Sequence, residues 1–131
     1  MSKIIILWIC MVFFHILDDF VLQGWLAQAK QKKFWQENAP DKLYRNDYKI
    51  ALLIHGFSWA CSVHIPVLLF CGIFERSIPF LTWFIMFNCH WLTHSYVDNL
   101  KANKHKISLI QDQLIHIGQI SLLWLAYIMV M

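Results

Sequence analysis

The sequence has few glycines, few prolines and no closely spaced cysteine pair. Only four of its 131 residues are glycine and three are proline. It contains no Gly-rich phosphate-binding loop and no nucleophile elbow, which argues against nucleotide-binding and serine-hydrolase folds. The four cysteines form no CxxC pair, so we expect buried hydrophobic side chains rather than a thiolate metal site. These cysteines are Cys10, Cys61, Cys71 and Cys89.

Hydrophobic residues, by contrast, are abundant. They make up 59% of the chain, whereas soluble domains contain roughly 45–50% even when glycine is counted. The length allows one domain at most, and small domains bury the smaller fraction of their surface. The composition therefore predicts a single integral membrane domain over residues 1–131.

Four apolar segments are long enough to cross a bilayer. Spanning helices need about 20 residues, and only helices or closed barrels satisfy their backbone hydrogen bonds in lipid. The segments lack strict alternation, which favours helices. We therefore predict an all-α, integral membrane four-helix bundle. Its approximate spans are residues 4–22, 50–74, 78–100 and 107–130.

Two basic loops predict the orientation of these spans. The loop over residues 24–49 holds six Lys and Arg, and the loop after Asp98 holds Lys101, Lys104 and Lys106. Positively charged loops stay in the cytoplasm, so both termini are expected outside. Aromatic residues among the lysines of the first loop suit an interfacial segment in contact with membrane lipids, although a plain solvated loop is the alternative. The net charge of +3 comes from these loops and does not indicate nucleic-acid binding.

Histidine and aspartate recur at a spacing of four in three predicted helices. Residues four apart share a helix face, and all these pairs fall near the cytoplasmic end. Charged groups inside lipid are costly and usually mark function. Imidazole and carboxylate ligands suit Zn, with Mn or Fe as alternatives, in one or two ions. The predicted metal ligands are His15, Asp19, His55, His94, Asp98, Asp112 and His116.

Two interpretations of these seven residues stay open. Seven exceed the needs of one tetrahedral ion, so two ions share them or some orient the histidines. The alternative to a metal is an interhelical network of hydrogen bonds and ion pairs. Asp19 and Asp112 are the predicted catalytic bases. Further residues are predicted to contact substrate or ligands, namely Gln23, Lys30, His90, Lys101 and Gln113.

The ordered pattern resembles a known family. The resemblance lies in four features taken in order: H-x-x-x-D-F-x-x-Q from His15, a lone His55, H-x-x-x-D-x-x-K from His94 and D-Q-x-x-H from Asp112. In these features the chain resembles the uncharacterised bacterial and phage membrane family catalogued as domain of unknown function 3307. The resemblance implies a small multi-spanning protein of the bacterial inner membrane. It supplies no established activity. The arrangement is more loosely similar to membrane-bound metal-dependent hydrolases.

Three functional hypotheses follow. The first is a membrane-embedded metal-dependent hydrolase of a phosphoester or lipid-linked substrate, opening to the cytoplasm, in which Lys101 neutralises phosphoryl charge. The second is a small transporter or channel, assembled as a homo-oligomer, that uses intramembrane Asp and His. The third is a phage membrane effector with a structural metal site. The apolar outer halves of the segments favour a one-sided pocket over a through path.

Overall fold

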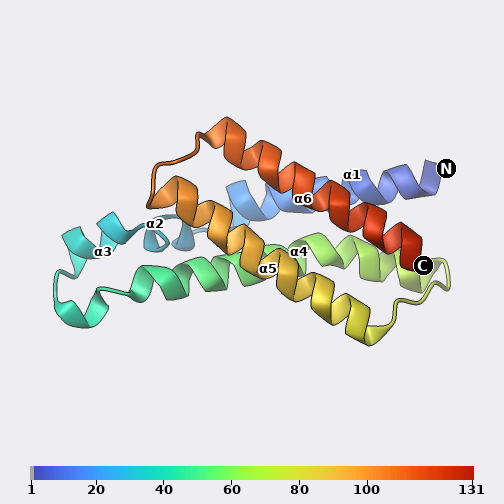
Figure 1. Cartoon of the computed structure of the whole chain (residues 1–131), viewed down its shortest axis with the longest axis horizontal. Coiled ribbons are helices and arrows are strands. Elements are labelled where there is room, and N and C mark those ends of the chain that lie inside the picture. Colours follow the sequence, from blue (N-terminus) through green and yellow to red (C-terminus); the bar gives the residue numbers. More distant parts are fainter. Residues whose placement is uncertain (1) are drawn as a thin grey trace.

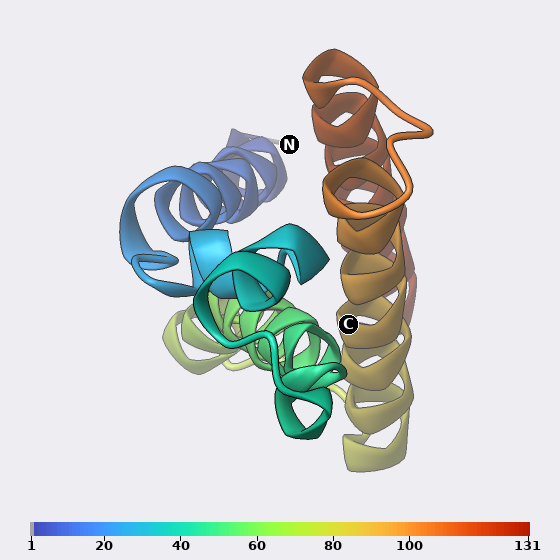
Figure 2. The same ribbon diagram turned by 90° about the vertical axis from the view of Figure 1, so that its left-hand side faces the viewer.

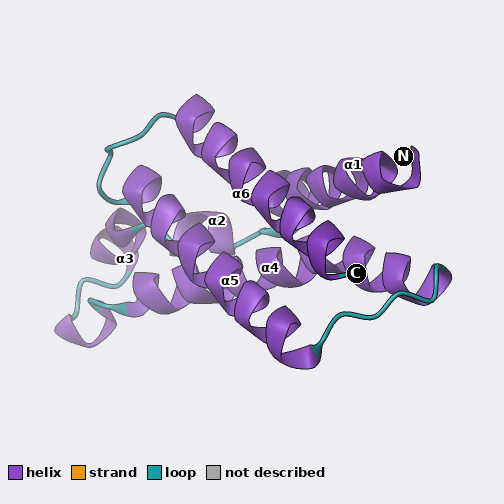
Figure 3. Ribbon diagram, turned by 45° about the vertical axis from the view of Figure 1, so that its right-hand side comes forward, coloured by secondary structure: helices purple, strands orange, loops and turns teal. Residues whose placement is uncertain are grey.

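The computed structural model describes residues 2–131, and Met1 of the predicted domain lies outside this range. Within it the chain forms six α-helices, one π-helical turn (η1) and one 3-10 turn (η2), with no strand (Figure 3). Each predicted span coincides with a long helix, the first being α1 continued by η1. The elements are α1 (Ser2–Leu17), η1 (Asp18–Leu22), α2 (Leu26–Ala29), α3 (Lys32–Asn38), η2 (Lys42–Tyr44), α4 (Asp47–Ile73), α5 (Phe80–Ala102) and α6 (Leu109–Val130).

The four long helices run alternately in opposite directions (Figure 1). α1 and α5 each pack against both α4 and α6. Viewed end-on, the short helices α2 and α3 lie in front of these long helices (Figure 2). The α1–α4 and α5–α6 connections lie at one end of the molecule, and the termini lie at the other (Figure 1). The two basic loops are therefore on the same end.

Three helical segments of residues 2–131 are long and apolar enough to cross a membrane. They cover Lys3–Leu22, Lys42–Ile73 and Leu109–Val130. The fourth predicted span, over residues 78–100, is helical but is not among them. Its mean hydropathy is lowered by polar residues such as His94 and Asp98, which α5 buries in the interior.

The distribution of polar and apolar side chains between interior and surface is the reverse of that in a water-soluble protein. Histidine and aspartate side chains are buried, whereas many large aliphatic and aromatic side chains on the long helices are exposed. Ile6, for example, is 56% exposed and His94 is 0% exposed. Such a surface is typical of a protein whose outer face contacts hydrocarbon, where charged groups avoid the lipid.

The interior has two halves. An apolar cluster that includes Leu7, Val63, Ile120 and Tyr127 fills the half nearer the termini. The half nearer the basic loops holds the buried aspartates and the buried histidines other than His64. Trp59 belongs to the apolar cluster and stacks on His94 at a centroid distance of 4.0 Å, so it lies where the halves meet.

The first loop is itself largely helical. Trp35 packs edge-on against Trp25 and Phe34 and stacks with Tyr44. The Trp35 indole N–H also donates to the carbonyl of Ala29 at 2.7 Å. This aromatic group gives α2 and α3 a packed structure of their own.

Candidate metal centre

All seven predicted metal ligands are buried in the polar half of the bundle. None is more than 5% exposed, and they come from all four long helical segments. Their spacing explains the convergence, because residues four apart lie on one helix face and each such face turns inward. His15 and Asp19 come from α1 and η1, His55 from α4, His94 and Asp98 from α5, and Asp112 and His116 from α6.

The π-helical turn η1 places both adjacent aspartates inside. In an α-helix, neighbouring side chains point about 100° apart, so one of two is usually turned outward. Here the N–H of Gln23 donates to the carbonyl of Asp18, five residues back, at 3.1 Å. This wider turn leaves Asp18 at 1% and Asp19 at 5% exposure. Turns of this kind are frequent at functional sites.

Four ligand atoms form the centre of the cluster. His55 Nε2 lies 3.2 Å from Asp19 Oδ1 and 3.3 Å from Asp98 Oδ2. His94 Nε2 lies 3.3 Å from His55 Nε2 and 3.7 Å from Asp19 Oδ1. A tetrahedral ion with bonds of about 2.0–2.1 Å separates its ligand atoms by roughly 3.3–3.4 Å. The spacing therefore matches what a small divalent cation requires.

Several overlapping sets of three ligands exist within the cluster. In each set, one atom per residue lies within 4.8 Å of the others, and every member is buried. These groups could hold a metal ion, whose identity is unknown. The same contacts also fit the predicted alternative of a metal-free ion-pair network. The sets are Asp19–His94–His116, His55–His94–Asp98, Asp18–Asp19–His55 and Asp98–Asp112–His116.

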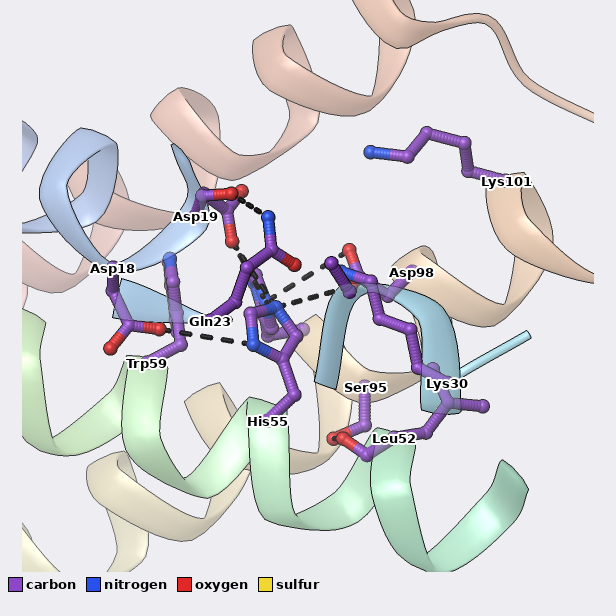
Figure 4. Close-up of polar contacts among 12 residues, drawn as sticks. Asp18, Asp19, Gln23, Lys30, Leu52, His55, Trp59, Ser95, Asp98 and Lys101 are labelled. Atoms are coloured by element: carbon purple, nitrogen blue, oxygen red, sulfur yellow. Dashed lines mark hydrogen bonds and ion pairs between the residues drawn. The ribbon is translucent and has the colours of Figure 1, made fainter. Parts of the chain in front are cut away.

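His55 has an orienting carboxylate behind it. Its Nδ1 faces Asp18 Oδ2 at 3.9 Å, while its Nε2 faces Asp19 and Asp98 (Figure 4). Asp18 is fixed in turn because its Oδ1 accepts hydrogen bonds from Ser58 at 2.8 Å and Ser62 at 2.9 Å. A carboxylate behind a histidine sets the tautomer that presents a lone pair to a metal.

His94 has a comparable partner. Its Nδ1 lies 3.2 Å from His116 Nδ1, while its Nε2 faces the cluster. His116 Nε2 then faces Asp98 Oδ1 at 3.3 Å and Asp112 Oδ1 at 3.4 Å. Gln119 also contacts His116 Nδ1 at 2.8 Å. The pair His116–Asp112 thus supports His94 from the side of α6.

His15 is the one predicted ligand that belongs to none of the four sets. Its Nδ1 accepts a hydrogen bond from the Trp59 indole N–H at 2.7 Å. Its Nε2 lies 3.1 Å from Gln113 Oε1 and can donate to it. Both ring nitrogens of His15 are therefore engaged by other groups.

Two lysines reach the cluster from its open side. Lys30 Nζ lies 2.5 Å from Asp98 Oδ2, and Lys101 pairs with Asp112 Oδ2. Figure 4 shows Lys30 and Lys101 on the same side of the cluster as Asp98. Each lysine contacts the oxygen of its carboxylate that does not face His116, and in Asp98 this oxygen, Oδ2, also faces His55 Nε2.

The other predicted polar residues differ in their contacts. The amide of Gln113 donates to both Asp19 Oδ2 and Asp112 Oδ2 at 3.2 Å. Gln23 donates to the backbone carbonyl of Asp19 rather than to its carboxylate. His90 lies away from the ligand sets and stacks on Trp59 at 5.7 Å.

Sequence reasoning missed several of these contacts. Asp18, Ser58, Ser62 and Gln119 had no assigned role at the site. Ser58 and Ser62 lie three and seven residues after His55, a spacing that places them on its helix face. That signal was available in the sequence, whereas the π-helical turn behind Asp18 had no comparable signal.

A pocket of about 360 Å³ reaches the cluster from the end that carries the basic loops. Its lining includes Asp19, Gln23, Lys30, Lys101 and Gln113. Asp19 is the only member of the four central ligands that lines it. The pocket therefore meets the cluster at this carboxylate, between two ammonium groups.

Comparisons with protein-family models, with curated proteins and with solved structures find no match for this chain. The resemblance to the uncharacterised bacterial and phage membrane family therefore stays a prediction.

Proposed function

We propose that the chain is a membrane-embedded, metal-dependent hydrolase acting on a phosphoester or lipid-linked substrate. The observation that carries this proposal is the pocket of about 360 Å³, which joins a buried His/Asp cluster to two lysines. Concave sites with a few convergent polar groups are typical ligand sites. Buried side chains from four helical segments form the cluster, as in metal sites of helix bundles.

In this proposal His55, His94 and Asp98 are the protein ligands of the ion. They form one of the three-residue ligand sets. Catalytic zinc sites commonly have three protein ligands and one open position, at which the ion activates water. Zn fits the nitrogen and oxygen donors best, and Mn or Fe are alternatives.

Asp19 is the proposed general base. It borders the pocket, and its Oδ1 lies 3.2 Å from His55 Nε2 and 3.7 Å from His94 Nε2. A carboxylate beside the open position can take a proton from the attacking water. Asp112, the other predicted base, pairs with Lys101 and faces His116, so we assign it to supporting His94 through His116.

The lysines favour an anionic substrate. Lys30 and Lys101 line the pocket, together with the amides of Gln23 and Gln113. Ammonium groups aimed at developing charge stabilise phosphoryl transition states. The proposed orientation, with basic loops in the cytoplasm, would open the pocket to the cytoplasmic headgroup layer.

Transport through the bundle is less well supported. The half of the interior nearer the termini is filled by an apolar cluster that includes Leu7, Met11, Val67 and Leu123. His64 is buried there, but its Nδ1 contacts the carbonyl of Ala60 one turn earlier in the same helix. A polar path to the terminal end would have to cross this apolar packing.

The test combines metal analysis with hydrolysis assays on detergent-purified protein. We expect metal in the wild type and its loss, with all activity, in His94→Ala. Asp19→Asn should keep the metal but slow hydrolysis of phosphomonoester, phosphodiester and lipid phosphate probes by about 10²–10⁴-fold, the usual contribution of a general base.

Asp41→Asn is the matched control, because Asp41 is an exposed loop carboxylate whose Oδ1 accepts a hydrogen bond from the backbone N–H of Leu43. It should leave both metal and activity unchanged. Absence of metal from the wild type, even after reconstitution with Zn, Mn and Fe, would refute the hydrolase and favour the transport hypothesis.

A further inference from the structure

The buried charges of the cluster do not balance among the described side chains. Four carboxylates, Asp18, Asp19, Asp98 and Asp112, are each at most 5% exposed. Only Lys30 and Lys101 form ion pairs with them as ammonium groups. With neutral histidines, a formal charge of −2 is left over. Buried charge of this kind is costly unless it is paired, and either one divalent ion or two protonated histidines would cancel it.

The cluster contains two adjacent cation positions that share one carboxylate. The first lies among His55, His94 and Asp98, which form one of the three-residue sets, with Asp19 beside it. His55 Nε2 lies 3.3 Å from both His94 Nε2 and Asp98 Oδ2, close to the separation in a tetrahedral site. The second lies among Asp98, Asp112 and His116, whose ligand atoms are within 4.8 Å of one another. A shared carboxylate between two neighbouring positions is the layout used by sites that hold two ions.

Lysine ammonium groups already pair with both carboxylates of the second position, at the oxygens that do not face His116. Lys30 Nζ lies 2.5 Å from Asp98 Oδ2, and Lys101 pairs with Asp112 Oδ2. The other oxygens, Asp98 Oδ1 and Asp112 Oδ1, face His116 Nε2 at 3.3 Å and 3.4 Å. Two ammonium groups carry the same charge as one divalent ion.

Hydrogen bonds to the backbone around Lys30 fix the position of this residue. Lys30 is 7% exposed, although lysine is rarely buried unless it is paired. Asn103, at the end of α5, donates from its amide to the carbonyl of Lys30 at 3.0 Å. The same side chain accepts from the backbone N–H of Lys32 at 2.6 Å. This double contact fixes the segment from which Lys30 enters the cluster.

We propose that the cluster binds one divalent ion, held by His55, His94 and Asp98, and that the charges of Lys30 and Lys101 take the place of a second. The inference rests on the metal site of the proposed function. It selects one of the two stoichiometries that the sequence left open, and it makes the lysines the determinants of that number. Removing both lysines then leaves four carboxylates, whose charge two divalent ions would balance.

The experiment measures bound metal per chain by mass spectrometry after loading with Zn²⁺ or Mn²⁺ and desalting. Wild type is expected to hold one equivalent. The double variant Lys30→Met/Lys101→Met, which keeps similar side-chain length without charge, is expected to hold two. Lys32→Met/Lys33→Met removes the same charge from exposed positions and should stay at one.

Two equivalents in the wild type would overturn the inference, and so would one equivalent in the folded double variant. If size-exclusion chromatography shows that the double variant does not fold, Lys101→Met replaces it. Lys101 is 27% exposed at the side chain and lies at the edge of the site. A second, weaker equivalent is expected there, and a variant that stays at one overturns the inference.

The same samples separate this inference from the proposed function. One equivalent without hydrolysis leaves the stoichiometry standing and removes the hydrolase. Two equivalents in a wild type that hydrolyses the probes overturn the stoichiometry and leave the hydrolase standing. No metal under any loading condition overturns both.

Discussion

Asp18 and Asp19 are neighbours with different surroundings. Asp18 accepts hydrogen bonds from Ser58 and Ser62 and faces the rear nitrogen of His55. Asp19 faces the front nitrogens of His55 and His94 and borders the pocket. One carboxylate therefore supports a ligand, and the other meets whatever enters the pocket.

Asp18→Asn should weaken metal binding without abolishing it. The amide can still accept from the two serines, but it lacks the negative charge that favours a proton on His55 Nδ1, 3.9 Å away. Loss of such an orienting partner typically costs 10–100-fold in metal affinity, which competition with a calibrated chelator would measure. Asp41→Asn is again the control, and an affinity equal to that of wild type would show that Asp18 does not orient His55.

For individual residues, the sequence predicted which histidines and aspartates lie together, but not which ring nitrogen of each histidine faces which partner. The spacing of four correctly brought His94, Asp98, Asp112 and His116 together. It could not show that Trp59 and Gln113 engage His15, because helix rotation and side-chain rotamers decide cross-helix contacts. The assignment of His15 as a ligand therefore stays a prediction.

Among the elements, the α4–α5 contact sets the distance between two candidate ligands. Gly56 follows His55, and a Cβ at this position would lie 2.1 Å from Ser95 Oγ and 3.1 Å from the carbonyl of Trp91. Ser95, which follows His94, also donates to that carbonyl at 2.9 Å. The close approach of the helices thus depends on the missing side chain.

Gly56→Ala should therefore destabilise the bundle. Overpacking of this kind costs about 1–3 kcal/mol, and the separation of α4 from α5 should also weaken metal binding. Thermal unfolding in detergent measures the first effect and chelator competition the second. Gly72→Ala, in the same helix with no atom within 4 Å of its Cβ, is the control and should match or slightly exceed wild-type stability.

A melting temperature for Gly56→Ala equal to that of Gly72→Ala would contradict this account. The sequence predicted these helices because long apolar runs are a strong signal. It did not predict which glycine lies at a helix contact, since that depends on the rotation of α4 relative to α5. The capping box of α6, formed by Ser108 and Gln111, was recognisable in principle from its spacing.

For the whole molecule, the ends differ in charge. The connections at one end hold Lys32, Lys33, Lys104 and Lys106, while the turn between α4 and α5 at the other end holds Glu75 and Arg76. Hydropathy alone predicted a membrane protein but could not fix the number of spans, because α5 buries much of its polarity. Its crossing of the membrane remains part of the proposal.

The orientation can be tested with single cysteines in a chain whose four native cysteines are replaced by serine. We expect a membrane-impermeant maleimide to label Ser77→Cys in intact bacterial spheroplasts, because this exposed turn should lie outside. Lys33→Cys should be labelled only after lysis. The opposite pattern would place the pocket on the outer side, away from cytoplasmic substrates.

The wide turn η1 also bears on how such a site tolerates insertions and deletions. It closes over five residues where an α-helix closes over four, so it is equivalent to one extra residue in α1. Deleting one residue from this turn would restore regular spacing and rotate one aspartate away from the interior. Homologous chains that differ in length by one residue here would then differ in which of the two carboxylates they keep inside.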